Sequence, residues 1–190
     1  MKILTPFLLF FILLPFSSFA QENKPNLPLK FLIQGALEFG GDPVAEVLFT
    51  NGDTQSVRAG QGGALGVGGE FRVLKLEALR FRASVGIKYV TTAADNVNIR
   101  LTRIPLHLTA NYMITKDIRI SAGLASHQRI RFNADGIGDN LTFPGANGPI
   151  FEVAFKGIGL SYTVMSYEDN LGEVYSANSI GITFSGVLPK

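Results

Sequence analysis

Residues 79–90 read LRFRASVGIKYV, and this stretch decides the fold. The odd positions from Leu79 to Tyr89 are all apolar, whereas the even positions from Arg80 to Lys88 are charged or small. Because successive side chains of a β-strand point to opposite faces, this alternation predicts a strand with one apolar and one polar face. The stretch is also longer than the five or six residues of a usual soluble strand.

The same alternation recurs along the chain and predicts eight strands. Each is near or above the roughly 9–11 residues that a tilted, membrane-crossing strand needs. The expected strands are residues 29–40, 60–73, 76–92, 98–114, 117–132, 148–156, 158–168 and 174–185.

The connections alternate in length, as in an outer-membrane barrel with short periplasmic turns and long extracellular loops. Short links fall near 73–75, 115–117 and 156–157, and longer, more polar ones at 41–59, 93–97, 133–147 and 169–173. Both chain ends then lie on the short-turn side. Residues 43–58 surround Asn51-Gly52-Asp53, a strong hairpin signal, and are interpreted as an extension of the first long loop. Counting its two arms as full strands would give ten.

The orientation of the faces follows from side-chain size. Eight strands enclose room only for side chains, and the polar faces are rich in Gly, Ser, Ala and Thr, whereas the apolar faces carry the bulky residues. We therefore expect an all-β, closed, antiparallel up-and-down transmembrane β-barrel with the apolar face outward. A secreted or periplasmic β-domain with the apolar face inward is the alternative.

The N-terminus and the composition support export. Residues 1–20 have a lysine, an apolar run and Ser18-Phe19-Ala20, and are expected to be a cleaved signal peptide, followed by a lead-in at 21–28 and the barrel at 29–190. The 190-residue chain has no cysteine, which excludes disulfide scaffolds, thiolate metal sites and thiol enzymes. Cleavage of the signal peptide would remove Lys2, so the 17 basic and 15 acidic residues become 16 and 15. This nearly even balance gives no indication of nucleic-acid binding.

The alternation of residues 98–114 changes phase. Ile99 and Leu101 are odd, whereas the apolar residues from Ile104 to Ile114 are even. A β-bulge near 102–104, next to Pro105, would restore one lipid-facing side.

Two segments resemble those of the outer-membrane protein β-barrel (porin-like) domain families. Residues 104–112, IPLHLTANY, resemble their I-P-L-x-L-x-A-x-Y strand, and residues 176–184, SANSIGITF, are similar to their last strand. The resemblance implies that a terminal aromatic, here Phe184, is recognised by the barrel-assembly machinery.

No segment predicts catalysis, a cofactor or a metal site. His107 and His127 should face the lumen, but Ser126-His127 alone makes no triad, and polar packing is the simpler interpretation. The glycine clusters at 60–63 and 66–69 lack the spacing of a nucleotide-binding loop, and residues 133–140 lack that of a calcium loop.

The charges expected to face the lumen are nine basic and three acidic. Buried charges need partners, so we expect glutamate–arginine ladders that fill the barrel, with the excess bases reaching water, loop acids such as Asp95, Asp135 and Glu168, or an anion. The expected set is Glu38, Glu70, Glu152, Arg72, Arg80, Arg82, Lys88, Arg103, Arg119, Arg129, Arg131 and Lys156.

Three functions follow as hypotheses. The first is a non-enzymatic, monomeric outer-membrane barrel with a structural or loop-mediated role, whose partners are outer-membrane lipid, lipopolysaccharide and the barrel-assembly machinery. The others are a small channel or carrier for an anionic or apolar solute, and a lipid-modifying enzyme.

Overall fold

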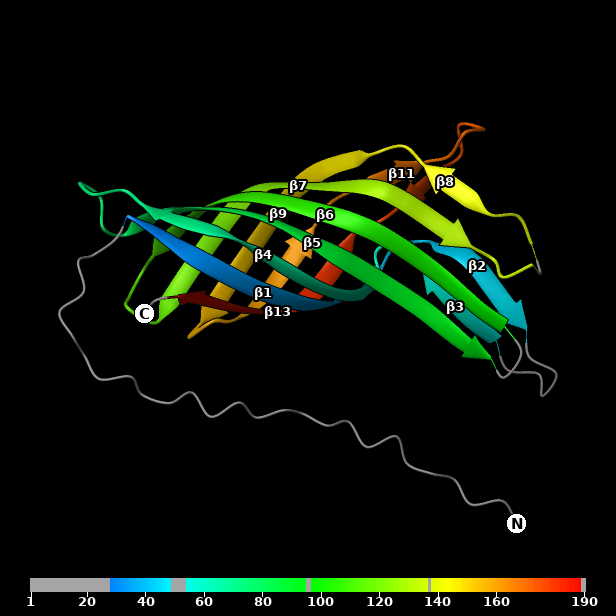
Figure 1. The fold of residues 1–190 in the computed structure, drawn as a ribbon, viewed down its shortest axis with the longest axis horizontal. Helices are drawn as coiled ribbons and strands as arrows, with labels where there is room; N and C mark the ends of the chain where they lie inside the picture. Colours follow the sequence, from blue (N-terminus) through cyan, green and yellow to red (C-terminus); the bar gives the residue numbers. More distant parts are fainter. Residues whose placement is uncertain (1–27, 49–53, 95–96, 137, 189–190) are drawn as a thin grey trace, which may run out of the picture.

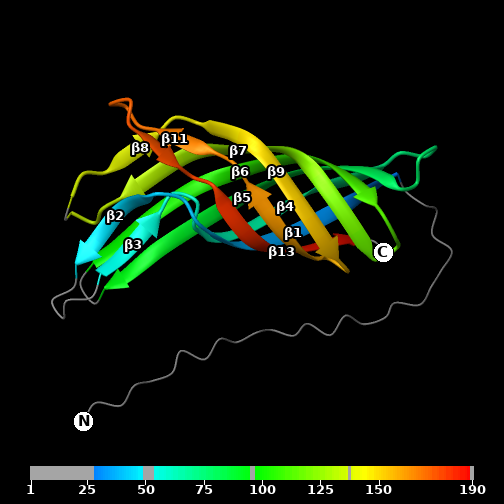
Figure 2. The same cartoon turned by 180° about the vertical axis from the view of Figure 1, so that it is seen from behind.

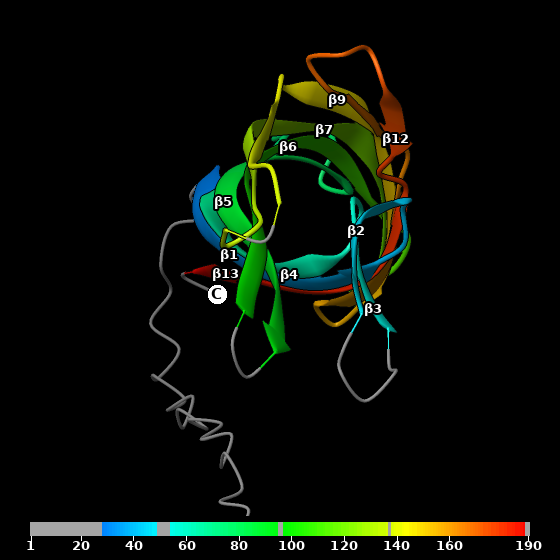
Figure 3. The ribbon, with the colours of Figure 1, turned by 90° about the vertical axis from the view of Figure 1, so that its right-hand side faces the viewer.

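Eight long antiparallel strands close into a barrel in the computed structural model, which describes residues 28–48, 54–94, 97–136 and 138–188 (Figure 1). Each barrel strand pairs with its sequence neighbours, and the first pairs with the last, so the ring is complete when viewed along its axis (Figure 3). The barrel strands are β1 (Leu29–Phe39), β4 (Gly62–Arg72), β5 (Leu79–Ala94), β6 (Val97–Met113), β7 (Ile118–Asn133), β9 (Ala146–Phe155), β10 (Ile158–Thr163) and β13 (Ser179–Leu188).

The remaining strands all belong to the long-loop end. Strands β2 (Pro43–Leu48) and β3 (Thr54–Arg58) form a separate hairpin, β8 (Leu141–Phe143) extends the edge of β7, and β11 (Ser166–Glu168) pairs with β12 (Val174–Ser176) (Figure 2). The predicted extension at 43–58 is therefore confirmed and the ten-stranded count is wrong. The tip at Asn51-Gly52-Asp53 lies outside the described residues, as do the expected signal peptide, most of the lead-in, and Asp95.

The predicted strands 158–168 and 174–185 are each interrupted. β10 stops at Thr163, and its course resumes as the short β11; β12 and β13 are likewise separated around Ala177. The ladders of β10 with β9 and β13 end at Thr163, and the Val164 N–H still donates to the carbonyl oxygen of Pro149 on β9 at 3.0 Å. Beyond it, β11 and β12 form their own hairpin. The short links at 73–78, 114–117 and 156–157 lie at the other end, where β1 begins and β13 ends.

Bulky apolar side chains cover the outside of the cylinder. The large apolar side chains among the exposed residues of the barrel strands have exposed fractions from 36% at Ile118 to 77% at Leu65. Aromatic residues on this outer surface occur toward both ends, near the short turns at Phe71, Phe81, Tyr112 and Phe155, and toward the loops at Phe39, Tyr89 and Tyr162. The outward residues run from Ile114, directly after β6, to Ile104 within it. These ten steps of about 3.4 Å, at a tilt near 40°, give a band roughly 25 Å tall.

Small residues line the inside where the strands approach most closely. A Cβ placed on Gly68 would overlap the carbonyl oxygen of Ala83 on β5, and one on Gly123 would overlap that of Leu108 on β6. The cluster at 66–69 lies within β4 and is followed by no helix among the described residues. The expected outward apolar and inward small faces are thus confirmed for the central cylinder.

The predicted bulge has a different position and a different effect. The β6–β7 register does shift between Thr102 and Ile104, but the extra residue belongs to β7, where Arg129 has a φ of 50°. β6 itself alternates without a break, so Ile99 and Leu101 point inward along with Arg103. Beyond the bulge, β7 turns Ile130 inward, and the neighbouring arginines turn outward.

The polarity of the barrel therefore reverses near its long-loop end. Within the band the outside is apolar and the inside polar; beyond it the inside is apolar, like the core of a water-soluble protein. The inner cluster is closed by side chains from the barrel strands and from the loop-end hairpins, and comprises Val57, Ala59, Val90, Ile99, Leu101, Ala125, Ile130, Phe132, Ala134, Phe143, Ala146, Ile150, Met165, Tyr167 and Ala177.

Candidate functional site

The lumen contains two layers of charge, and the layer nearer the short turns is built around Glu70. This side chain is 2% exposed and accepts from Arg82 at 2.7 Å and from Arg80 at 3.2 Å. The register explains the contact with Arg82, because Glu70 on β4 lies directly opposite it on β5. Across the lumen, Arg119 on β7 pairs with Glu152 on β9. These contacts form the glutamate–arginine ladder that the sequence predicts.

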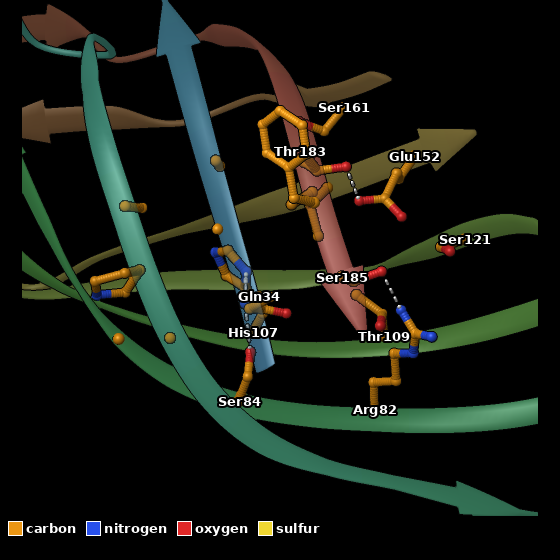
Figure 4. A pocket seen from close by; sticks show the side chains of 18 of the residues that line it. Gln34, Arg82, Ser84, His107, Thr109, Ser121, Glu152, Ser161, Thr183 and Ser185 are labelled. Atoms are coloured by element: carbon orange, nitrogen blue, oxygen red, sulfur yellow. Dashed lines mark hydrogen bonds between the residues drawn. The ribbon is translucent and has the colours of Figure 1, made fainter. Parts of the chain in front are cut away.

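A bridge links the two halves of this layer. The Oγ atom of Ser185 on β13 accepts from Arg82 at 3.2 Å and from Arg119 at 3.3 Å. The second oxygen of Glu152 accepts from the Thr183 hydroxyl at 2.8 Å (Figure 4). The layer thus joins strands on opposite sides of the ring through charge-assisted hydrogen bonds.

The second layer lies below the apolar cluster and is built around Lys88 and Arg103. Lys88 is 1% exposed, pairs with Glu38 at 2.8 Å and donates to the carbonyl oxygen of Gly60 at 2.7 Å. Arg103, also 1% exposed, donates to the carbonyl oxygens of Ala59 and Gln61. Backbone carbonyls of the segment that follows β3 therefore take the place of water around these two cations, and the hydrogen bonds hold this segment across the lumen.

His127 and Tyr167 complete this second layer. The His127 Nδ1 atom lies 2.6 Å from the Tyr167 hydroxyl, which also accepts from Arg103 at 3.3 Å. Burial raises the pKa of the Tyr167 phenol, which keeps it a neutral hydroxyl able to donate and accept together. Tyr167 comes from β11, so the hairpin beyond β10 is anchored to the barrel interior.

A cavity of about 60 Å³ lies between the layers, lined among others by Gln34, Ser84, His107 and Thr109 (Figure 4). The Gln34 amide donates to Ser84 at 2.9 Å, and its nitrogen lies 3.5 Å from the His107 Nδ1 atom. Since about 10–15 Å³ of such space is needed for one water molecule, the cavity has room for a few waters. Buried ion pairs of the two charge layers lie on either side of it.

Nine of the twelve predicted lumen charges face inward, and three do not. Arg129 and Arg131 are exposed on the outer surface, because the bulge reverses the alternation of β7. Lys156 is exposed in the β9–β10 turn with a φ of 49°, and its ammonium lies 5.2 Å from the Phe155 ring centre. The prediction for Arg129 and Arg131 is wrong because strict alternation does not continue through the bulge in β7. The prediction for Lys156 is wrong because alternation does not continue into the turn after β9.

The two histidines face the lumen as predicted, where the described contacts of their rings are with Gln34 for His107 and with Tyr167 for His127. Ser126 lies on the opposite face of β7 from its neighbour His127, and its hydroxyl accepts from Gln128 at 2.8 Å. Within the described ranges, no group of three or more His, Asp or Glu side chains could hold a metal ion. In the 133–140 loop, the side-chain oxygens of Asn133 and Asn140 accept backbone N–H groups, which close the loop on itself.

Sequence reasoning missed Tyr167, Ile99 and Leu101 as interior residues. For Ile99 and Leu101 a signal was present, because they share odd parity with Arg103 and His107 on the same strand. The change of phase in residues 98–114 therefore shows that the inner face becomes apolar there. It does not come from an extra residue in β6. Tyr167 had no comparable signal, since its place depends on the turn that leads from β10 into β11.

No helix in the part of the chain that the structure describes is long and apolar enough to cross a membrane. No family model matches the chain, and no curated protein matches it. Among solved structures it is similar to Ail, the attachment invasion locus protein of Yersinia pestis, with 7% identity and a TM-score of 0.46 over 83% of this chain and 97% of that one. It is also similar to Neisserial surface protein A, with 12% identity and a TM-score of 0.44 over the same shares.

These likenesses concern architecture alone, and the chain's own geometry carries the assignment. A closed hydrogen-bonded ring leaves no strand edge open, a requirement for spanning lipid, and its exterior band has the height of a bilayer's apolar layer. The chain is an eight-stranded up-and-down β-barrel of the transmembrane type.

Proposed function

We propose that this protein is a non-enzymatic integral outer-membrane barrel whose function resides in its long-loop end. The observation that carries the proposal is the reversal of polarity along the axis. A barrel that ended at the membrane would have no need of an apolar core beyond its lipid-facing band. Here the strands continue past the band, turn apolar inside, and pack against two hairpins.

Hydrogen bonds hold the segments of the long-loop end to the barrel and to each other. The backbone after β3 is held by Arg103 and Lys88, and β11 is held by Tyr167. Asp42 accepts the backbone N–H of Ser176 at 2.7 Å, which joins the first and the last long loops. Rigid strands that present loops to the outside are a common basis for binding.

The ion pairs that cross the lumen support this role over transport. The Lys88–Glu38 pair and the Arg103 contacts lie between the cavity and the loop end, and the Glu70 and Glu152 pairs lie on the other side. A solute larger than a few waters would have to break these buried ion pairs to pass. Each such break would cost several kcal/mol.

Export, insertion and environment complete the proposal. Residues 1–20 would serve as the cleaved signal peptide, and the barrel-assembly machinery would insert the chain as a monomer. Outer-membrane lipid and lipopolysaccharide would surround the apolar band.

Fractionation of the expressing host tests the class. We expect the full chain in the outer-membrane fraction, resistant to carbonate extraction, with a gel mobility that changes on boiling. Recovery of the folded protein from the soluble periplasm would contradict the proposal.

Planar-bilayer recordings test the role. We expect no steady conductance at neutral pH from the wild-type chain. A steady current that disappears on replacing Arg82 would favour the channel instead. A lipid A profile that differs between the wild type and a deletion strain would favour an enzyme.

A further inference from the structure

We propose that Arg100, Arg129 and Arg131 form a site on the outer wall of the barrel that binds phosphate groups of membrane lipid headgroups. This inference rests on the proposed membrane location and adds a specific lipid chemistry to it. The partner is the leaflet that surrounds the long-loop end of the barrel.

The bulge in β7 creates the site. Without the extra residue near Arg129, the alternation of β7 would keep Arg129 and Arg131 in the lumen with Arg119 and His127. With it, both arginines are exposed on the wall, beside β6. Arg131 lies opposite Thr102, and Arg100 lies one outward position beyond Thr102 on β6, so Arg100 and Arg131 are diagonal neighbours about 7 Å apart at their Cβ atoms.

The depth of the three arginines matches the headgroup region. The last outward apolar residues on this side are Tyr89 on β5 and Ile104 on β6, and Tyr89 pairs with Thr102. Arg131 is level with Thr102, so it lies one outward position, about 7 Å along the strand, beyond Ile104. Side chains at this level leave the hydrocarbon and enter the layer that holds the phosphates.

The charges of the patch are not neutralised by the neighbouring strands. The direct cross-strand partners of Arg100 are Thr91 and Asn133, and those of Arg131 are Thr102 and Thr142. Among the described residues, none of the three arginines is in an ion pair of 4.0 Å or less.

The loop acid Asp135, which lies beside β6, is already engaged. The Asp135 carboxylate accepts the backbone N–H of Asn98 at 2.8 Å. Arg100 and Arg131 are diagonal neighbours, and Arg129 lies two residues before Arg131 on the same wall, so like charges gather here. An anion that accepts from more than one of these side chains relieves their repulsion. Guanidinium groups bind phosphate oxygens in a bidentate manner, which suits a lipid phosphate at this depth.

Spin-labelled lipids measure the preference directly. The full chain is inserted into phosphatidylcholine bilayers, and the fraction of motionally restricted label is compared for phosphatidic acid and phosphatidylcholine probes. The test variant is Arg100→Gln/Arg129→Gln/Arg131→Gln. The matched control is Lys75→Gln/Lys116→Gln/Lys156→Gln, which removes three exposed cations at the short-turn end. Gel mobility before and after boiling verifies folding, and Arg131→Gln alone replaces the triple variant if that variant does not fold.

We expect the wild type to prefer phosphatidic acid by about fivefold or more, the arginine variant to lose most of this preference, and the lysine variant to retain it. Equal losses in both variants, or no loss in the arginine variant, would overturn the site. Inorganic phosphate that displaces the labelled lipid at constant ionic strength would also overturn it, in favour of a soluble anion. A chain that inserts without headgroup preference refutes only this site, whereas a chain that restricts no lipid at all refutes the membrane location as well.

Discussion

Replacing Glu70 with glutamine tests whether the lumen charges act as a desolvated network. The Glu70 side chain is 2% exposed and is shared by Arg80 and Arg82, whose side chains are 22% and 10% exposed. Glutamine keeps the shape but removes the charge. The variant therefore leaves two cations facing a neutral amide in a confined interior.

The structure sets the magnitude of the loss. Removing one partner of a buried ion pair typically costs about 3–5 kcal/mol. Arg82 retains its hydrogen bond to Ser185, and Arg80 is partly hydrated, so the lower end applies. We expect the free energy of unfolding to fall by about 3 kcal/mol.

Urea titration of the barrel in lipid vesicles, followed by gel mobility without boiling, measures this free energy. Glu77→Gln is the matched control, because Glu77 is exposed in the 73–78 link and should change stability by no more than about 0.5 kcal/mol. The double variant Glu70→Gln/Arg82→Met should recover part of the loss by removing the stranded cation. A loss below about 1 kcal/mol for Glu70→Gln, or one equal to that of the control, would refute a desolvated network.

Three further predictions concern the reversal of polarity. Since the chain has no cysteine, single substitutions can report side-chain direction: Arg131→Cys should react with a membrane-impermeant maleimide on intact cells, and Phe132→Cys should stay protected until unfolding. If Phe132→Cys were labelled faster than Arg131→Cys, the side chains of β7 would not change sides after the bulge. Leu101→Ala should lower the free energy of unfolding by about 2–4 kcal/mol, because Leu101 is fully buried in the apolar cluster. Leu108 faces lipid, so Leu108→Ala should lower this free energy by less in the same urea titration. Tyr167→Phe should lower the free energy of unfolding by about 1–2 kcal/mol, because the hydroxyl bonds both His127 and Arg103. Protease added to intact vesicles should then cut the 164–178 loop faster than in the wild type. An unchanged cleavage rate would mean that this contact does not anchor β11.

The sequence alone determined the cylinder. Period-two alternation is local information, since each residue's side follows from that of its neighbour, and stretches such as 79–90 show it without interruption. The size difference between the faces fixed which side is outward, because only small and ionic side chains fit inside eight strands. The sequence therefore predicts that Glu38, Glu70 and Glu152 lie in the lumen and pair with basic residues, as they do in the structure.

Only the tertiary structure decided where that pattern reverses. The extra residue in β7 is defined by its register against β6, which a single strand's sequence does not contain. The burial of Ile99 and Leu101 depends on hairpin residues distant in sequence, such as Val57 and Tyr167, that close over them. Arg129 and Arg131 thus look like lumen residues in the sequence and lie on the outer wall in the fold, because a one-residue shift moves every later side chain to the opposite face.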